Sequence, residues 1–108
     1  MKAIWDDTIL AESDDIITVE GNAYFPMDSL KKEYFDQSKS MSLCLWKGKA
    51  SYFSVIVNGK TNKDCAWYYP KPSFLAKKVK NRVAFWKGVQ LVNRNNPNCC
   101  YEQSNAIF

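Results

Sequence analysis

The dipeptide Asn58-Gly59 stands between two segments that are rich in aromatic and β-branched residues. Residues 49–57 read Lys-Ala-Ser-Tyr-Phe-Ser-Val-Ile-Val, and residues 65–69 read Cys-Ala-Trp-Tyr-Tyr. Both compositions favour strands, and Asn-Gly supplies the two residues with positive φ that a type I′ turn needs. The sequence therefore predicts a β-hairpin that turns at Asn58-Gly59.

The rest of the chain also consists of short β-prone segments separated by turn residues. Residues 8–12 and 16–20 are predicted strands, and the polar cluster Ser13-Asp14-Asp15 between them predicts a second hairpin. Glu20-Gly21-Asn22 is a further turn. Strands are also expected over residues 23–25, 82–86 and 89–92.

Two short helices and one loop complete the expected pattern. Asp28 or Ser29 can cap a helix that runs to Phe35, and Ser73 can cap another. Residues 36–40 are polar and are expected to form a loop. These elements predict a mainly β fold, either a small antiparallel β-sandwich or a partly open barrel, with one or two short helices. Residues 1–92 form one β-rich domain in this interpretation, and residues 93–108 are a polar C-terminal tail.

The cysteines and the chain's start indicate a cytoplasmic protein. The chain has no histidine, and its cysteines, which include no Cys-x-x-Cys pair, are Cys44, Cys65, Cys99 and Cys100. This pattern does not suit a zinc site or a disulfide framework, so we expect four thiols and no metal. The first residues turn acidic where a signal peptide would become apolar, and no apolar run approaches the ~20 residues that span a bilayer. We therefore expect a soluble cytoplasmic domain without a membrane partner.

Charge is unevenly distributed along the chain. Residues 1–40 hold nine acidic and four basic side chains, whereas residues 41–108 hold two acidic and eleven basic ones. A basic face for anions or nucleic acid is one interpretation. The alternative is that folding brings the two halves together and removes the asymmetry.

Several enzyme classes are excluded by missing residues. Four glycines cannot form a phosphate-binding loop or a dinucleotide fingerprint, and a chain without histidine has no His-based triad. Asp64 is the only carboxylate between residues 37 and 101, so a magnesium site built from clustered carboxylates is poorly supported.

The tripeptide Trp-Lys-Gly occurs twice, at residues 46–48 and 86–88. An indole beside an ammonium group can stack on a planar ring and hold an anion. Trp67 and its neighbouring tyrosines add a third aromatic cluster. The candidate ligand-binding residues are Trp46, Lys47, Tyr52, Asp64, Trp67, Tyr69, Trp86 and Lys87.

Each candidate also has an ordinary structural interpretation. The tryptophans and Tyr52 can be plain core residues, and the two lysines can be solvated strand ends. Cys44 and Cys65 are more typical of small buried apolar groups than of nucleophiles, and Asp64 can be a turn residue.

These segments resemble a family catalogued as domain of unknown function 427, in places labelled a nucleotidyltransferase domain. The matching residues are Cys44, Trp46, Lys47, Gly48, Ala50 and Tyr52, then Ala66, Trp67, Tyr69 and Pro70, then Val83, Ala84 and Phe85. The resemblance covers most of residues 3–92, with Leu45 where the family usually has proline. It implies a compact, mostly β fold and implies little about activity. The Gly-Ser with spaced acidic residues that marks nucleotidyl transfer is not in this chain.

Three functions remain open. The favoured one is binding of a small planar or anionic ligand, such as a nucleotide or a related metabolite, in a pocket lined by the aromatic candidates and flanked by Lys47 and Lys87. The second is a nucleic-acid-binding module, without sequence-specific recognition of DNA. The third is an enzyme in which Lys47 and Asp64 act as acid and base. The sequence identifies no cofactor, and it leaves the ligand and the oligomeric state open.

Overall fold

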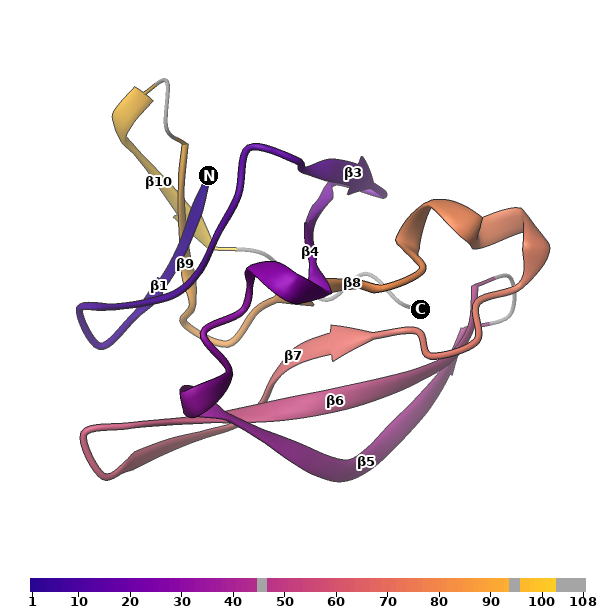
Figure 1. Ribbon diagram of the computed structural model, residues 1–108, viewed down its shortest axis with the longest axis horizontal. Helices are drawn as coiled ribbons and strands as arrows, with labels where there is room; N and C mark the ends of the chain where they lie inside the picture. Colours follow the sequence, from indigo (N-terminus) through magenta and orange to yellow (C-terminus); the bar gives the residue numbers. More distant parts are fainter. Residues whose placement is uncertain (45–46, 94–95, 103–108) are drawn as a thin grey trace.

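The chain folds into two antiparallel β-sheets in a computed structural model that describes residues 1–44, residues 47–93 and the backbone of residues 96–102 (Figure 1). The smaller sheet has the strand order β10-β9-β1-β2, and the larger one has the order β3-β4-β8-β7-β6-β5. The strands are β1 (Lys2–Trp5), β2 (Thr8–Glu12), β3 (Ile17–Val19), β4 (Asn22–Pro26), β5 (Phe35–Cys44), β6 (Gly48–Val57), β7 (Lys60–Tyr68), β8 (Arg82–Phe85), β9 (Gln90–Asn93) and β10 (Asn96–Glu102). The predicted mainly β fold is therefore confirmed, as two sheets that do not close into a barrel over the described residues.

The helical structure consists of short 3₁₀ turns. They are η1 (Met27–Ser29), η2 (Lys32–Tyr34) and η3 (Phe74–Val79). They stand where the two short helices are predicted, but Phe35 already begins β5, and η3 is kinked at Ala76. Within the described ranges, no helix is long and apolar enough to cross a membrane.

The hairpin at Asn58-Gly59 is confirmed. Strands β6 and β7 are antiparallel, and Val57 pairs with Lys60 across the turn. Asn58 has φ 53° and Gly59 has φ 76°, which are the two positive values of a type I′ turn.

The hairpin predicted at residues 13–15 is wrong. Strand β2 pairs instead with β1, through a two-residue turn at Asp6-Asp7, and β3 pairs with β4 through a turn at Glu20-Gly21. Both turns place positive φ at their central residues, so their twist matches that of the strands they join. Residues 13–15 therefore connect the two sheets rather than two paired strands.

The loop predicted at residues 36–40 is also wrong, because these residues lie in β5. This strand is at the edge of the larger sheet and pairs only with β6 in the sheet order. Edge strands can be polar because one side of the strand faces solvent. Gln37 stabilises the polar segment, since its side chain donates to the Tyr52 carbonyl oxygen at 3.2 Å and accepts from the Tyr68 hydroxyl at 2.7 Å.

Alternation along the strands of the larger sheet produces two separate cores. On β4 and β8, Phe25 and Phe85 belong to a cluster that includes residues of the smaller sheet, such as Leu10. The residues next to them, Tyr24 and Ala84, belong to a second cluster that includes Val79 of η3. Because successive side chains point to opposite faces, the larger sheet is buried on one face by the smaller sheet and on the other by η3.

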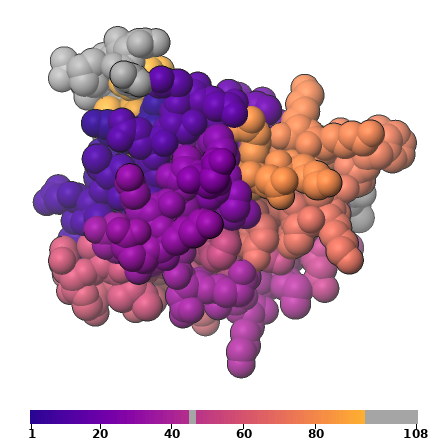
Figure 2. All heavy atoms as spheres, viewed as in Figure 1, coloured from indigo at the N-terminus to yellow at the C-terminus, as the bar shows by residue number. Residues whose placement is uncertain are grey.

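The acidic and basic halves of the chain are brought together by folding. Three ion pairs each join a carboxylate of residues 1–40 to a cation of residues 41–108: Lys47 with Glu20, Lys60 with Asp6, and Arg82 with Asp15. The charge asymmetry of the sequence is thus reduced in the folded protein. Exposed lysines remain around η3, at Lys77, Lys78 and Lys80. This part of the chain stands out at the right of the space-filling view (Figure 2).

Candidate functional site

Lys47 is a fully buried cation immediately before β6. Its side chain has an exposed fraction of 0% and forms an ion pair with Glu20. The ammonium nitrogen lies 5.5 Å from the ring centroid of Tyr69. A buried ammonium group costs several kcal/mol in lost hydration unless a carboxylate or other polar partner compensates it. The site is therefore built around Lys47 and its partner.

Gly48 allows the chain to cover Lys47. It has φ 106°, and a Cβ atom at this position would lie 3.3 Å from the carbonyl oxygen of Lys71. The backbone N–H of Ser73 donates to the Lys47 carbonyl oxygen at 3.1 Å. A glycine is thus needed where the segment leading into η3 packs over the start of β6.

Glu20 reaches Lys47 from the turn between β3 and β4. It has φ 54°, an exposed fraction of 37% for its side chain, and Gly21 as its neighbour. Seven non-glycine residues in the described chain have positive φ, and five of them are Asp or Asn, the types that best tolerate it. The two others are Glu20 and Lys87. Glu20 thus occupies a conformation that its residue type does not favour.

Aromatic side chains surround the ion pair. Tyr24, Tyr52, Trp67 and Tyr69 are buried in the cluster beneath η3, together with Cys44. The indole N–H of Trp67 donates to the Tyr24 hydroxyl at 3.2 Å, and their rings meet edge to face. Tyr69 is 1% exposed, and its hydroxyl has no hydrogen-bond partner in the part of the chain that the structure describes. Its side chain also interacts with that of Tyr24, so a neighbouring acceptor for this hydroxyl lies within the cluster.

Burial keeps the phenols of this cluster protonated. It raises the pKa of Tyr24, although the neighbouring Trp67 and Lys47 act in the opposite direction. It raises the pKa of Tyr69 well above the usual range, and the nearby Tyr24 and Cys44 act in the same direction. Both hydroxyls can therefore donate hydrogen bonds at neutral pH.

A cavity of about 350 Å³ opens beside Glu20. It lies between β3 and η3, which contact each other, and its lining consists of Thr18, Val19, Glu20, Leu75, Ala76, Lys78 and Val79. Val19, Ala76 and Val79 also pack against the aromatic cluster. The cavity therefore has an apolar wall that continues into the cluster, and Glu20 stands between it and Lys47.

The second Trp-Lys-Gly segment forms a different environment. Lys87 is exposed, and its ammonium nitrogen lies 4.8 Å from the Trp86 ring centroid and 3.4 Å from the Lys63 carbonyl oxygen. The Trp86 indole donates to the Asp64 carbonyl oxygen at 2.7 Å and meets Trp67 edge to face. Lys87 thus lies at the surface, in the turn that follows β8.

Asp64 is held ionised beside Lys87. Partial burial raises the pKa of this carboxyl group, but hydrogen bonding from Ser38 and Ser40 and the charge of Lys87 outweigh it, so the pKa is below its ordinary value of 3.8. Asp64 has φ 56° but lies within β7, where the register against β6 shifts between Phe53 and Val55, so the prediction of a turn residue before the strand is wrong. Its carboxylate and the Lys47 ammonium have different neighbours, which separates the acid and base considered from the sequence.

The structure thus divides the predicted residues into two groups. Tyr52, Trp67 and Tyr69 share the cluster beneath η3, and Lys47 lies beside Tyr69. Asp64 and Lys87 form the second group with Trp86, and the contact between Trp67 and Trp86 joins the two groups. Trp46 lies outside the described residues.

Sequence reasoning missed Glu20 and Tyr24 as site residues, and it missed that η3 forms one wall of the cavity. The available signal was a glutamate at the first position of a Glu-Gly turn, where Asn or Asp is typical. Tyr24 gave no separate signal, because an aromatic residue in a strand is ordinary.

The thiols offer no nucleophile in the described chain. Cys44 and Cys65 are free and buried. Burial raises the pKa of Cys65 to about 12, so its thiolate is scarce at neutral pH. The predictions for Cys99 and Cys100 fall on side chains outside the described residues.

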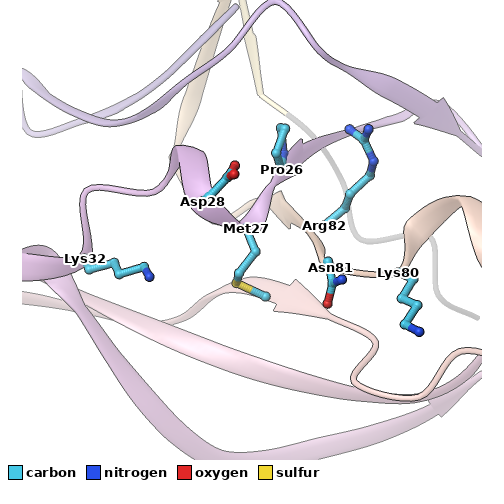
Figure 3. Close-up of a pocket in the computed structure, with 7 residues that line it drawn as sticks. All are labelled: Pro26, Met27, Asp28, Lys32, Lys80, Asn81 and Arg82. Carbon is cyan, nitrogen blue, oxygen red and sulfur yellow. The ribbon is translucent and has the colours of Figure 1, made fainter.

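Another hollow, of about 450 Å³, lies on the surface between η1 and β8 (Figure 3). It is lined by Pro26, Met27, Asp28, Lys32, Lys80, Asn81 and Arg82. Figure 3 shows Lys80 and Arg82 pointing in opposite directions. Arg82 is already bound, since its guanidinium donates to the carboxylate and the carbonyl oxygen of Asp15 at 2.9 and 3.0 Å. Because Lys80 and Arg82 do not converge on this hollow, it is a weaker candidate for a ligand site than the cavity beside Glu20.

A family model, described as a domain of unknown function (DUF427), matches residues 1–95. The chain belongs to the DUF427 family. The match spans both sheets up to the end of β9, and it confirms the family suspected from the Trp-Lys-Gly segments. No curated protein gave a significant sequence match. The family description assigns no activity to this DUF427 domain.

Proposed function

We propose that this DUF427 domain binds a small planar or anionic ligand at Lys47, and that the ligand enters through the cavity between β3 and η3. The observation that carries the proposal is the full burial of the Lys47 ammonium behind Glu20, which lines that cavity. A buried ion pair contributes little to stability compared with apolar residues of the same volume. A role in recognition explains why a cation is kept there.

The surroundings suit such a ligand. The Tyr69 ring centroid lies 5.5 Å from the Lys47 ammonium nitrogen, so a cation and an aromatic side chain border the same buried space. A volume of about 350 Å³ is at the small end of the range for ligand pockets, which fits a metabolite rather than a macromolecule.

We also propose a cytoplasmic location, which the use of unpaired cysteines supports.

A nucleic-acid-binding function is the second candidate, because of the surface of η3. Phe74 is 77% exposed, and Lys77 and Lys78 follow it on the same segment. An exposed ring with nearby cations can stack on a base and contact phosphates. Affinity for nucleic acid would fall steeply with salt, whereas binding at one buried cation would change little.

A thermal-shift measurement with small anions and nucleotides tests the first proposal. We expect at least one of these ligands to raise the melting temperature of the wild type and to have no effect on Lys47→Met. Lys49→Met is the matched control, because Lys49 is exposed two residues away and the change in charge is the same. The proposal is wrong if no ligand stabilises the wild type, or if all three proteins respond equally.

A further inference from the structure

We propose that Glu20 occupies the place of the ligand's anionic group in the empty protein, and that the ligand which displaces it is a monocarboxylate with a small apolar body. This inference rests on the proposed function and names the ligand class for the same site. The binding step exchanges one carboxylate for another on the Lys47 ammonium, and no covalent bond changes.

The first argument is that a ligand entering the cavity reaches Glu20 before it reaches Lys47. Glu20 lines the cavity and is 37% exposed, whereas Lys47 is fully buried behind it. A ligand that enters between β3 and η3 can reach the ammonium only if the Glu20 side chain moves. Because that side chain already borders solvent, it can be hydrated once it is displaced.

The second argument is the backbone conformation of Glu20. A type I′ turn favours Asn, Asp or Gly at its first position, and a long side chain there is strained by roughly 1 kcal/mol. The turn at Asn58-Gly59 follows this preference, and the turn at Glu20-Gly21 does not. Unfavourable backbone conformations that persist in a fold are a reason to look for a role of the side chain. Here the side chain neutralises the buried ammonium.

The third argument concerns the charge and shape of the ligand. The cavity wall next to Glu20 is apolar, with Val19, Ala76 and Val79, so the body of the ligand should be apolar as well. The one buried ammonium of the site balances one negative charge; Lys78 also lines the cavity, but it is exposed and hydrated and adds little to this balance. A carboxylate matches it, whereas the phosphate of a nucleotide brings up to two charges into the same place. A small apolar body with a single carboxylate is thus favoured over a nucleotide.

Isothermal titration with benzoate tests the inference, with benzamide as the neutral ligand of the same shape. We expect Glu20→Gln to bind benzoate about tenfold or more tightly than the wild type, because the internal competitor is removed. Glu12→Gln is the matched control: Glu12 is an exposed carboxylate on β2, and its loss should leave the affinity unchanged. Benzamide should bind to none of these proteins.

The variant Glu20→Gln is expected to melt below the wild type, because it leaves the ammonium without its carboxylate. Its melting temperature is therefore a second readout, and benzoate should raise it more than it raises that of the wild type. The double variant Lys47→Met/Glu20→Gln should fold and should not bind benzoate.

The outcomes separate this inference from the function on which it rests. Equal benzoate affinity in the wild type and Glu20→Gln would overturn the role of Glu20 and leave ligand binding at Lys47 intact. Tighter binding of adenosine monophosphate than of benzoate by Glu20→Gln would overturn the ligand class. If neither protein binds any anion tested, the proposed function fails as well.

Discussion

The two Trp-Lys-Gly segments have the same tripeptide and opposite environments. Lys47 is fully buried and paired with Glu20, whereas Lys87 is exposed on a turn, near the ring of Trp86. The difference comes from what covers each segment. The chain that leads into η3 packs over the start of β6, and the corresponding position after β8 is an open turn. The comparison teaches that the tripeptide alone does not define a ligand site.

Their glycines differ in the same way. Both have positive φ, so both positions disfavour a side chain. A Cβ on Gly48 would lie 3.3 Å from the Lys71 backbone, whereas a Cβ on Gly88 would lie 3.9 Å from Trp5, an ordinary contact. The buried segment is thus constrained by packing and conformation, and the exposed one by conformation alone.

The largest difference in stability is expected between the two variants that each remove one charge of the Lys47–Glu20 ion pair. Glu20→Gln leaves a buried ammonium and should lower the free energy of unfolding by about 3 kcal/mol. Lys47→Met leaves a carboxylate that solvent can reach, and should stay within about 1 kcal/mol of wild type. Urea denaturation of both variants measures the asymmetry. Equal losses would show that the two charges are buried alike.

The next largest effect should come from the two glycines. Gly48→Ala combines an unfavourable φ with close backbone contact and should destabilise the domain by about 2–3 kcal/mol, whereas Gly88→Ala should cost about 1 kcal/mol. Thermal or urea unfolding of the pair ranks them. The reverse order would mean that residues 71–73 do not pack against the start of β6.

Lys87→Met should have a small effect. Exposed substitutions usually change stability by no more than about 0.5 kcal/mol, and the Lys87 contacts are at the surface. We expect its unfolding curve to overlay that of the wild type and its response to anions to be unchanged. If ligands no longer raise the melting temperature of this variant, both Trp-Lys-Gly segments belong to one ligand site.

The smallest effect concerns Asp64, the carboxylate beside Lys87, and its contribution to the stability of the domain in acid. The pKa of Asp64 is lower in the folded protein than its ordinary value of 3.8. Ionised Asp64 therefore stabilises the fold above pH 3.8, and this stabilisation is lost as the pH falls through the pKa of the folded protein. Asp64→Asn keeps a residue type that tolerates φ 56° and removes the titration. The wild type should therefore lose more melting temperature than the variant on acidification below about pH 4. Parallel curves would contradict the lowered pKa.

Strand pairing was predictable where the turn is short and local. Asn58-Gly59 specifies its hairpin because the two residues that need positive φ are the types that adopt it most readily. The cluster at residues 13–15 looks similar in composition, yet it bridges two sheets, since the two-residue turn at Asp6-Asp7 already pairs β2 with β1. Residues 36–40 lie in a strand because Asp36 and Gln37, and then Met41, pair with β6 around a register shift, which local composition does not reveal.

The sequence by itself determined the β architecture, the central hairpin and the family, because turn residues and alternating strands act over a few positions. Only the tertiary structure decided that Lys47 is buried and Lys87 is not. The partner of Lys47 is Glu20, 27 residues away and in another hairpin, and the cover is η3, which follows β7. The charge environment of a side chain depends on which distant segments exclude water from it, and no local pattern contains that information.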